Sequence, residues 1–278
     1  ALILFAGFIG LILVGIPVSI SIGAAVFATF LTSQFSDATY IIPQQLLEGV
    51  RKPSLTAVPF FIMAGNLMNT VGMTDRIFNF ANSLVGHFKA GLAQVNVLAS
   101  MVFAGVSGAA VADCAGLGMI EIKAMRERGY NPEFAAALTV CSAVIGPIIP
   151  PSIGLVIYAF LAQQSIERMF LAGLVPGLLV GLSLMVFNRI LATKQHFPTQ
   201  EKASRETILK TSLDGILALG APGIILGAIL FGFVTATEAG VLACLYTIVL
   251  GVLYRSITLR GLYTALSDTM MMTTIIMI

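Results

Sequence analysis

Ser107 and Asp113 stand out because they are polar side chains within a long apolar stretch, residues 90–122. Ser107 lies in the run Gly105-Val-Ser107-Gly108, whose glycines let the backbone turn and neighbouring segments approach closely. A carboxylate in an apolar segment is costly, and by default it faces a polar cavity or a partner group. Asp113 therefore either lines the route of a polar ligand or bonds to neighbouring amides and hydroxyls. The residues alone leave both interpretations open.

A second unusual run, residues 145–154, reads IGPIIPPSIG. Pro147, Pro150 and Pro151 lack amide donors and block helical hydrogen bonding, which predicts an unwound break within the apolar stretch 132–163. Carbonyl groups in such a break are free to bind something else. Together with the glycine-rich turn they could surround an alkali cation without a buried carboxylate. The alternative is a proline kink held in place by neighbouring helices.

The remaining polar candidates indicate structure rather than chemistry. Glu238 follows Thr235 and Thr237 at a predicted turn, where a threonine N-cap and a glutamate in the first helical turn are both favourable. The cysteines lie in apolar runs without CxxC spacing, and we interpret them as small hydrophobic residues. They are Cys114, Cys141 and Cys244.

The elements that position these residues are predicted to be helices in a lipid bilayer. The 278 residues are 58% hydrophobic and 10% charged, whereas soluble domains are about 25% charged. We therefore predict an all-α polytopic membrane protein. The net charge of +2 provides no basic face, so nucleic acid is excluded as a partner. The apolar stretches fall at about 1–14, 17–33, 54–71, 90–105, 108–122, 132–163, 166–188, 212–232, 236–254 and from 268 onward.

Residues 90–128 are predicted to form a re-entrant helical hairpin rather than two full crossings. Each apolar half has about 15 residues and as a helix covers about 22 Å, which is short of a hydrocarbon core of about 30 Å. Irregular backbone at mid-membrane is tolerated only where protein or a cavity surrounds it. We therefore expect the hairpin tip, residues 105–110, to be packed within the protein.

The basic residues predict an orientation. If each apolar stretch crosses once and the hairpin returns to its starting side, 12 of the 15 lysines and arginines lie on one side. The positive-inside rule makes that side cytoplasmic and places the linker 191–211 in the cytoplasm. Segments 72–89 and 257–267 are amphipathic, and we expect both to lie along the membrane surface. Only Arg51, Lys52 and Arg168 fall on the opposite side.

The order of elements predicts an inverted repeat. The first unit has scaffold spans in 1–71, the hairpin, a broken span and a further span at 164–190. The second has scaffold spans in 212–256, then a surface helix and the start of another span in 257–278. An odd number of crossings in the first unit inverts the second, as in many secondary transporters. Because the chain starts and stops within apolar runs, we expect a longer protein whose second hairpin and broken span follow Ile278.

Several sequence runs occur together in a specific order. They read PFFIMAGNLM from Pro59, GLAQVNVLASMVFAGVSG from Gly91, AVAD from Ala110, GY from Gly129 and IGPIIPPS from Ile145. Along nearly the whole chain they resemble the large membrane subunit of TRAP (tripartite ATP-independent periplasmic) transporters. The run TATEA from Thr235 also matches, except that Ala236 stands where the family has proline. We expect that departure to alter only the turn.

The resemblance implies a function and its partners. It implies an elevator-type importer in the bacterial inner membrane that uses Na⁺ as coupling ion to carry an organic acid, such as a C4-dicarboxylate or sialic acid. A small four-helix membrane subunit, separate or fused, and a periplasmic substrate-binding protein would be the partners. The family's subunit is not an enzyme. The hairpin 90–128 and the broken helix 129–163 would form the moving transport domain, and 72–89 an arm.

The resemblance also implies site residues. Sodium would be bound by the backbone around Ser107 and by carbonyls of three residues in the break, Gly146, Ile149 and Pro151. The substrate carboxylate would lie beside the hairpin tip, close to Ser107, Gly108 and Asp113.

A different class of protein shares one motif. Gly105-Val-Ser107-Gly108 also matches the GxSG of intramembrane serine proteases, in which the serine needs a histidine base from another span. The histidines, His87 and His196, lie at the end of a predicted surface arm and in the linker, so neither is expected to reach mid-membrane. A passive channel subunit is a further alternative, but it would need no broken helix.

Overall fold

The computed structural model describes residues 2–32, 40–50, 53–194, 197 and 202–277. These residues contain helices and turns and no strand. Within these ranges, three helices are long and apolar enough to cross a membrane, and a bent helix pair makes a fourth candidate. The prediction of an all-α polytopic membrane protein with a broken helix is confirmed. The chain divides into two units, residues 1–52 with 274–278, and residues 53–273, which are described separately.

The smaller unit contains α1 (Leu2–Leu13), α2 (Val18–Leu31) and α3 (Ile41–Val50). A tight turn joins the first two helices, which pack against each other. Gly15 takes the positive φ of +88° that the turn requires, and Pro17 occupies the N-cap of α2. The predicted spans at 1–14 and 17–33 are therefore helices, although each is shorter than a full crossing.

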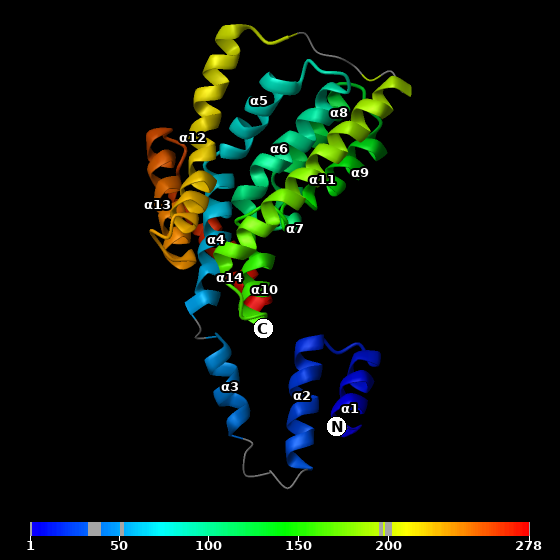
Figure 1. The fold of residues 1–278 in the computed structure, drawn as a ribbon, viewed down its shortest axis with the longest axis vertical. Coiled ribbons are helices and arrows are strands. Elements are labelled where there is room, and N and C mark those ends of the chain that lie inside the picture. The colour runs from blue at the N-terminus through cyan, green and yellow to red at the C-terminus, as the bar shows by residue number, and fades with distance from the viewer. Residues whose placement is uncertain (1, 33–39, 51–52, 195–196, 198–201, 278) are drawn as a thin grey trace. The chain divides into compact units, whose positions relative to one another are not determined.

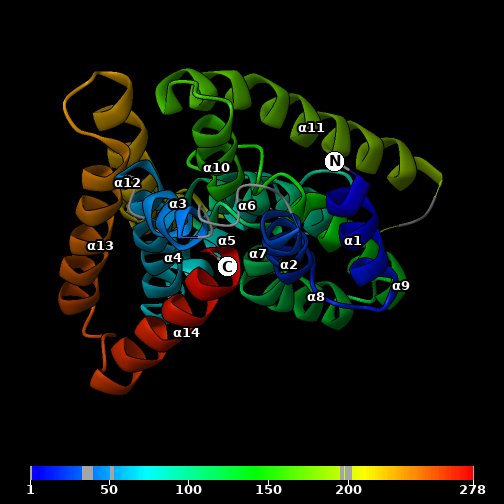
Figure 2. The ribbon, with the colours of Figure 1, turned by 90° about the horizontal axis from the view of Figure 1, so that it is seen from below.

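The larger unit begins with a bent pair, α4 (Pro53–Thr70) and α5 (Met73–Val85), which meet at an angle of 72°. Gly72, with φ +78°, makes the bend. The long helices are α11 (Ile166–Lys194), α12 (Arg205–Leu230) and α13 (Ala236–Leu253). Helix α14 spans Leu259–Met277. Within this unit α4, α12 and α13 lie together on one side (Figure 1, Figure 2).

The segment for which a re-entrant hairpin was predicted, 90–128, contains three helices, α6 (Gly91–Ser107), α7 (Ala110–Ala115) and α8 (Leu117–Glu127). The chain reverses after Ser107 and runs back beside α6. The predicted break is also present, because α9 (Pro132–Ala143) and α10 (Ile153–Leu161) are separated by non-helical residues that include all three prolines. Together with α11 these helices form the other side of the unit (Figure 1).

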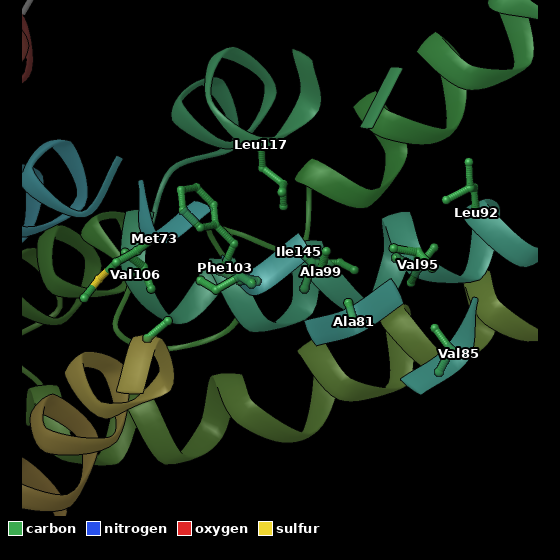
Figure 3. Close-up of a cluster of buried hydrophobic side chains, with 14 of the residues drawn as sticks. Met73, Ala81, Val85, Leu92, Val95, Ala99, Phe103, Val106, Leu117 and Ile145 are labelled. Atoms are coloured by element: carbon green, nitrogen blue, oxygen red, sulfur yellow. The ribbon is translucent and has the colours of Figure 1, made fainter. Parts of the chain in front are cut away.

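Helix α6 is the centre of the core. Its side chains are buried on nearly every face, and Figure 3 shows Leu92, Val95, Ala99, Phe103 and Val106 lined up along it. Residues of α5 and α8 pack around them. In a bilayer, apolar burial gives little net drive between helices, so close van der Waals packing by small residues is the source of stability. The many Gly, Ala and Ser residues of α6 fit this requirement.

Three element boundaries differ from those expected from the sequence. The linker predicted at 191–211 is shorter, since α11 continues to Lys194 and α12 begins at Arg205 after the N-cap Ser204. The surface helix predicted at 257–267 and the following span are one continuous helix, α14, because no Pro or Gly interrupts Leu262–Met277. The returning arm of the hairpin is divided at Gly116.

Candidate functional site

The hairpin tip lies directly against the break between α9 and α10. Gly108 ends α6 with φ +60°, and a Cβ atom there would lie 2.8 Å from the Pro151 carbonyl oxygen. The same Cβ would lie 3.1 Å from the Ile153 nitrogen, whose N–H donates to the Gly108 carbonyl at 3.4 Å. Both the left-handed conformation and the close approach require glycine at position 108.

The break has its own internal support. Ser152 is the N-cap of α10: its hydroxyl donates to the Pro147 carbonyl at 2.6 Å and accepts from the Leu155 N–H at 3.3 Å. Helix α11 presses on the other side of the break through glycines. A Cβ atom on Gly173 would lie 2.5 Å from the Ile148 carbonyl oxygen, and one on Gly177 would collide with the Ile149 side chain. The unwound segment is therefore held between the hairpin tip and α11.

Asp113 is placed beside the break by the short helix α7. The carboxylate is 2% exposed, and its Oδ1 accepts a hydrogen bond from the Ser107 hydroxyl. Its Oδ2 is buried and has no hydrogen-bond partner among the residues that the structure describes. A Cβ atom on Gly146 would collide with this Oδ2, so the free oxygen points at the break. The serine hydroxyl provides a donor for Oδ1, and Oδ2 is left without a donor from the described residues.

The carbonyl groups predicted to bind sodium also lack hydrogen-bond donors from the described residues. Within the described residues, no hydrogen-bond donor contacts the carbonyl oxygens of Gly146, Ile149 or Pro151. A buried acceptor without a donor is unfavourable unless another group, such as a cation, takes the donor's place. These carbonyls and the Asp113 Oδ2 make the tip and break an electronegative region.

The structure gathers most of the predicted site residues. Ser107 contacts Asp113, Asp113 contacts Gly146, and Gly108 contacts Pro151. For Ile149, the contacts among the described residues are those of its side chain with Gly177 of α11 and of its N–H, which donates to the Ile145 carbonyl, so the position of its own carbonyl stays a prediction. The ligands that these residues bind, and their division between sodium and substrate, stay predictions.

A second buried polar group was missed by the sequence reasoning. Glu121 of α8 is 1% exposed, and its Oε2 accepts from the Asn96 amide of α6 at 2.7 Å. The same amide donates to the Thr139 hydroxyl of α9 at 2.7 Å, and Asn96 Oδ1 accepts from Ser142 at 2.8 Å. The network cross-links both arms of the hairpin to α9. The sequence does hold a signal for this network. Asn96, Glu121 and Thr139 are polar residues within apolar stretches that were expected to pack together.

The two ends of the hairpin are joined at its base. The Tyr130 hydroxyl, which follows α8, donates to the carbonyl of Ala90, which precedes α6, at 2.9 Å. The chain therefore leaves the hairpin close to the point where it enters it. Burial raises the pKa of Tyr130 above its usual value, so the phenol, which is already protonated at neutral pH, stays a donor. Its ring stacks on Phe197 with centroids 5.0 Å apart.

The geometry around Ser107 disfavours the protease alternative. The Ser107 hydroxyl donates to Asp113, and no imidazole among the described residues accepts its proton. His87 precedes α6 whereas Ser107 ends it, so the helix separates them by about 25 Å. His196 lies outside the described residues. A fluorophosphonate that labels Ser107 would contradict this assignment.

Glu238 has the capping role expected from the sequence. Its Oε2 accepts from the Thr235 N–H at 2.7 Å, and the Thr235 hydroxyl accepts from the Glu238 N–H at 3.4 Å. This reciprocal pair is a capping box that starts α13. Ala236, the departure from the family motif, is the first residue of the helix and leaves the cap intact.

Comparison with known proteins gives consistent matches. A family profile described as "Tripartite ATP-independent periplasmic transporter, DctM component" matches residues 5–278. The chain is 44% identical over 97% of its length to the sialic acid TRAP transporter large permease protein SiaM of Vibrio cholerae, and covers 63% of that protein. It is 37% identical over its whole length to the 2,3-diketo-L-gulonate TRAP transporter large permease protein YiaN of Escherichia coli, of which it covers 65%.

A third relative has a different length. The chain is 39% identical over 95% of its length to the sialic acid TRAP transporter permease protein SiaT of Haemophilus influenzae, and covers 43% of that protein. The chain thus spans less than two thirds of each of these relatives. The matched region includes the hairpin, the break and the capping box.

Proposed function

Because this chain belongs to the family of DctM components of tripartite ATP-independent periplasmic transporters, we propose that it imports an organic acid coupled to sodium. The observation that carries the proposal is the electronegative region where the hairpin tip meets the break. Asp113 Oδ2 and the carbonyls of Gly146 and Pro151 are acceptors without donors. A dehydrated monovalent cation is the ligand that such a set of oxygens suits best.

The order of binding follows from the charges. The Asp113 carboxylate and the open carbonyls repel a bare organic acid, so the acid binds beside Ser107 and Gly108 only once a cation has neutralised the region. The cation also links the tip to the break across the contact at Gly108. Sodium and substrate therefore bind with positive coupling, on the order of 5- to 150-fold in affinity.

The movement that carries the ligands across the membrane is proposed to be of the elevator type. Helices α6–α10 would move as the transport domain of the first repeat, with the hairpin re-entrant in the membrane. Helices α4, α12 and α13 would be the scaffold, and α5 the arm between the two groups. The Asn96–Glu121 network supports rigid motion, because it ties α6, α8 and α9 into one body. An inverted second repeat would supply the other half of the site.

The substrate class is proposed from the relatives. Their names include transporters of sialic acid, of 2,3-diketo-L-gulonate and of C4-dicarboxylates, which share a carboxylate. A small membrane subunit and a periplasmic substrate-binding protein would complete the system in the inner membrane. The basic residues would place the linker 191–211 on the cytoplasmic side.

The test is uptake by the complete permease, reconstituted in vesicles with its small subunit and its loaded binding protein. Uptake of the acid is expected with an inward sodium gradient and is lost when potassium replaces sodium at equal ionic strength. Labelled substrate inside the vesicles is the readout. Equal uptake in potassium would contradict sodium coupling, and uptake without the binding protein would contradict the proposed partner.

A further inference from the structure

A cavity of about 540 Å³ lies between the base of the hairpin and the cytoplasmic half predicted for α11. It is far from the tip, because it is lined by residues before and at the start of α6, including His87 and Gln94. Leu182, Val186 and Arg189 line it from α11. Ligand pockets commonly have volumes of about 300–1,000 Å³, so the cavity is large enough for a small molecule or a lipid head group.

The charges at the cavity favour an anion. Lys89 and Arg189 both line it, and the described residues around it include no Asp or Glu. A smaller polar pocket between α5 and α12 is different, since its Arg76 is already paired with Asp214 at 3.2 Å. The two cations at the larger cavity have no such internal counter-ion in the described part of the chain.

The buried side chain of Gln94 indicates that a ligand of this cavity carries a hydrogen-bond donor. Gln94 is 4% exposed and lines the cavity. Its amide Nε2 donates to the Met185 carbonyl of α11 at 2.8 Å, which fixes the orientation of the group. The Oε1 of Gln94 is buried and has no hydrogen-bond partner in the described part of the chain. A ligand that satisfies this site therefore carries a hydroxyl or other donor next to its negative charge.

The third feature is the apolar wall. Leu182 and Val186 line the cavity yet are 54% and 58% exposed, and neighbouring Phe88 is 48% exposed. In a membrane protein such side chains contact acyl chains. A site with cations at the predicted cytoplasmic interface and apolar residues towards the bilayer has the polarity of a phospholipid.

We propose that this cavity binds the head group of an anionic phospholipid with a hydroxyl-bearing head, such as phosphatidylglycerol. The phosphodiester lies between Lys89 and Arg189, a head-group hydroxyl donates to Gln94 Oε1, and the acyl chains follow α11 past Leu182 and Val186. The lipid joins the hairpin base to α11. This site does not depend on the proposed transport of organic acids.

The first experiment measures lipid affinity of the full-length protein by native mass spectrometry after delipidation. Phosphatidylglycerol is expected to bind about thirtyfold more weakly to the double variant Lys89→Gln/Arg189→Gln than to the wild type. The matched control is Lys123→Gln/Arg126→Gln, which removes two exposed basic residues of α8 outside the cavity. Equal affinity of the cavity variant and the wild type would overturn the proposal.

The second experiment separates the head-group contact from charge alone. Phosphatidylmethanol has the same phosphodiester and chains but no head-group hydroxyl, and the wild type is expected to bind it about fivefold more weakly than phosphatidylglycerol. Gln94→Met is expected to abolish this preference while keeping the affinity for phosphatidylmethanol. Displacement of the lipid by soluble glycerol phosphate would show a site for free anions and would also overturn the proposal.

Discussion

Asp113 and Glu238 occupy the same local position, the first turn of a helix, yet their surroundings differ completely. Glu238 is part of a capping box, and its carboxylate is matched by the Thr235 N–H and hydroxyl. Asp113 is buried, its helix has no side-chain cap, and one of its oxygens faces the break without a partner. A helix N-terminus explains the first carboxylate in full. For the second, we propose that a ligand completes it.

The largest effect is expected from filling the space that Asp113 faces. Gly146→Leu places a side chain against the Asp113 carboxylate and the Ala143 carbonyl, so sodium-driven uptake by the reconstituted permease should fall to background. Ser107→Ala should lower uptake less, because the backbone groups of the site remain. Gly223→Leu is the matched control, since that helical glycine has open space around it. Equal uptake by wild type and Gly146→Leu would contradict the proposed cation site at the tip and the break.

The second-largest effect is expected from removing the negative charge of Asp113. Asp113→Asn keeps an oxygen that accepts from Ser107 but removes the negative charge that faces the break. The sodium affinity should fall by about 10- to 100-fold, which corresponds to one charge-assisted contact. The half-saturating sodium concentration for uptake measures this change. The matched variant Glu238→Gln should leave that concentration unaltered, and a shift of the same size there would remove the distinction between the two carboxylates.

Glu121 provides a further case, because its carboxylate is buried with Oε2 bonded to the Asn96 amide, while Oε1 has no hydrogen-bond partner among the described residues. Glu121→Leu leaves the Asn96 amide with one partner fewer and is expected to cost about 1–3 kcal/mol of stability. Glu121→Gln retains an acceptor and should cost less. Thermal unfolding of the detergent-solubilised protein ranks the two variants. A Leu variant as stable as the wild type would show that the network does not hold the hairpin together.

The smallest effect is expected at the capping box. Thr235→Ala removes one acceptor for the α13 N-terminus and should cost about 1 kcal/mol of stability. Sodium-driven uptake, normalised to the amount of folded protein, should be unchanged. A loss of uptake beyond the loss of folded protein would give this region a part in transport that its geometry does not provide.

The same contrast shows what sequence reasoning can and cannot reach. The break and the capping box were predictable because their causes are local: Pro147, Pro150 and Pro151 stop a helix, and a threonine three residues before a glutamate starts one. The reversal of the chain after Ser107 followed from the glycine-rich turn, whereas the re-entrant placement argued from helix length stays a prediction. In each case neighbouring residues in the chain fix the conformation.

The rest depends on residues far apart in the chain. The contacts of Gly173 and Gly177 with the break, and of Asn96 with Glu121, arise only when distant helices pack. The continuity of α14 was missed because an amphipathic pattern that gives way to an apolar one does not itself end a helix. The sequence left open whether Asp113 lines a ligand route or only bonds to neighbouring groups, because the surroundings of its carboxylate depend on the positions of Ser107 and Gly146.

The most direct test is hydrogen–deuterium exchange of the full-length permease in sodium and in potassium at equal ionic strength. If the tip and the break bind sodium, amides in 105–115 and 144–153 should exchange more slowly in sodium, because the ion holds these segments together. Amides around the capping box, 235–240, should exchange equally in both salts. Equal exchange of the tip and the break in sodium and potassium would contradict the central claim that this unpartnered region is a cation site.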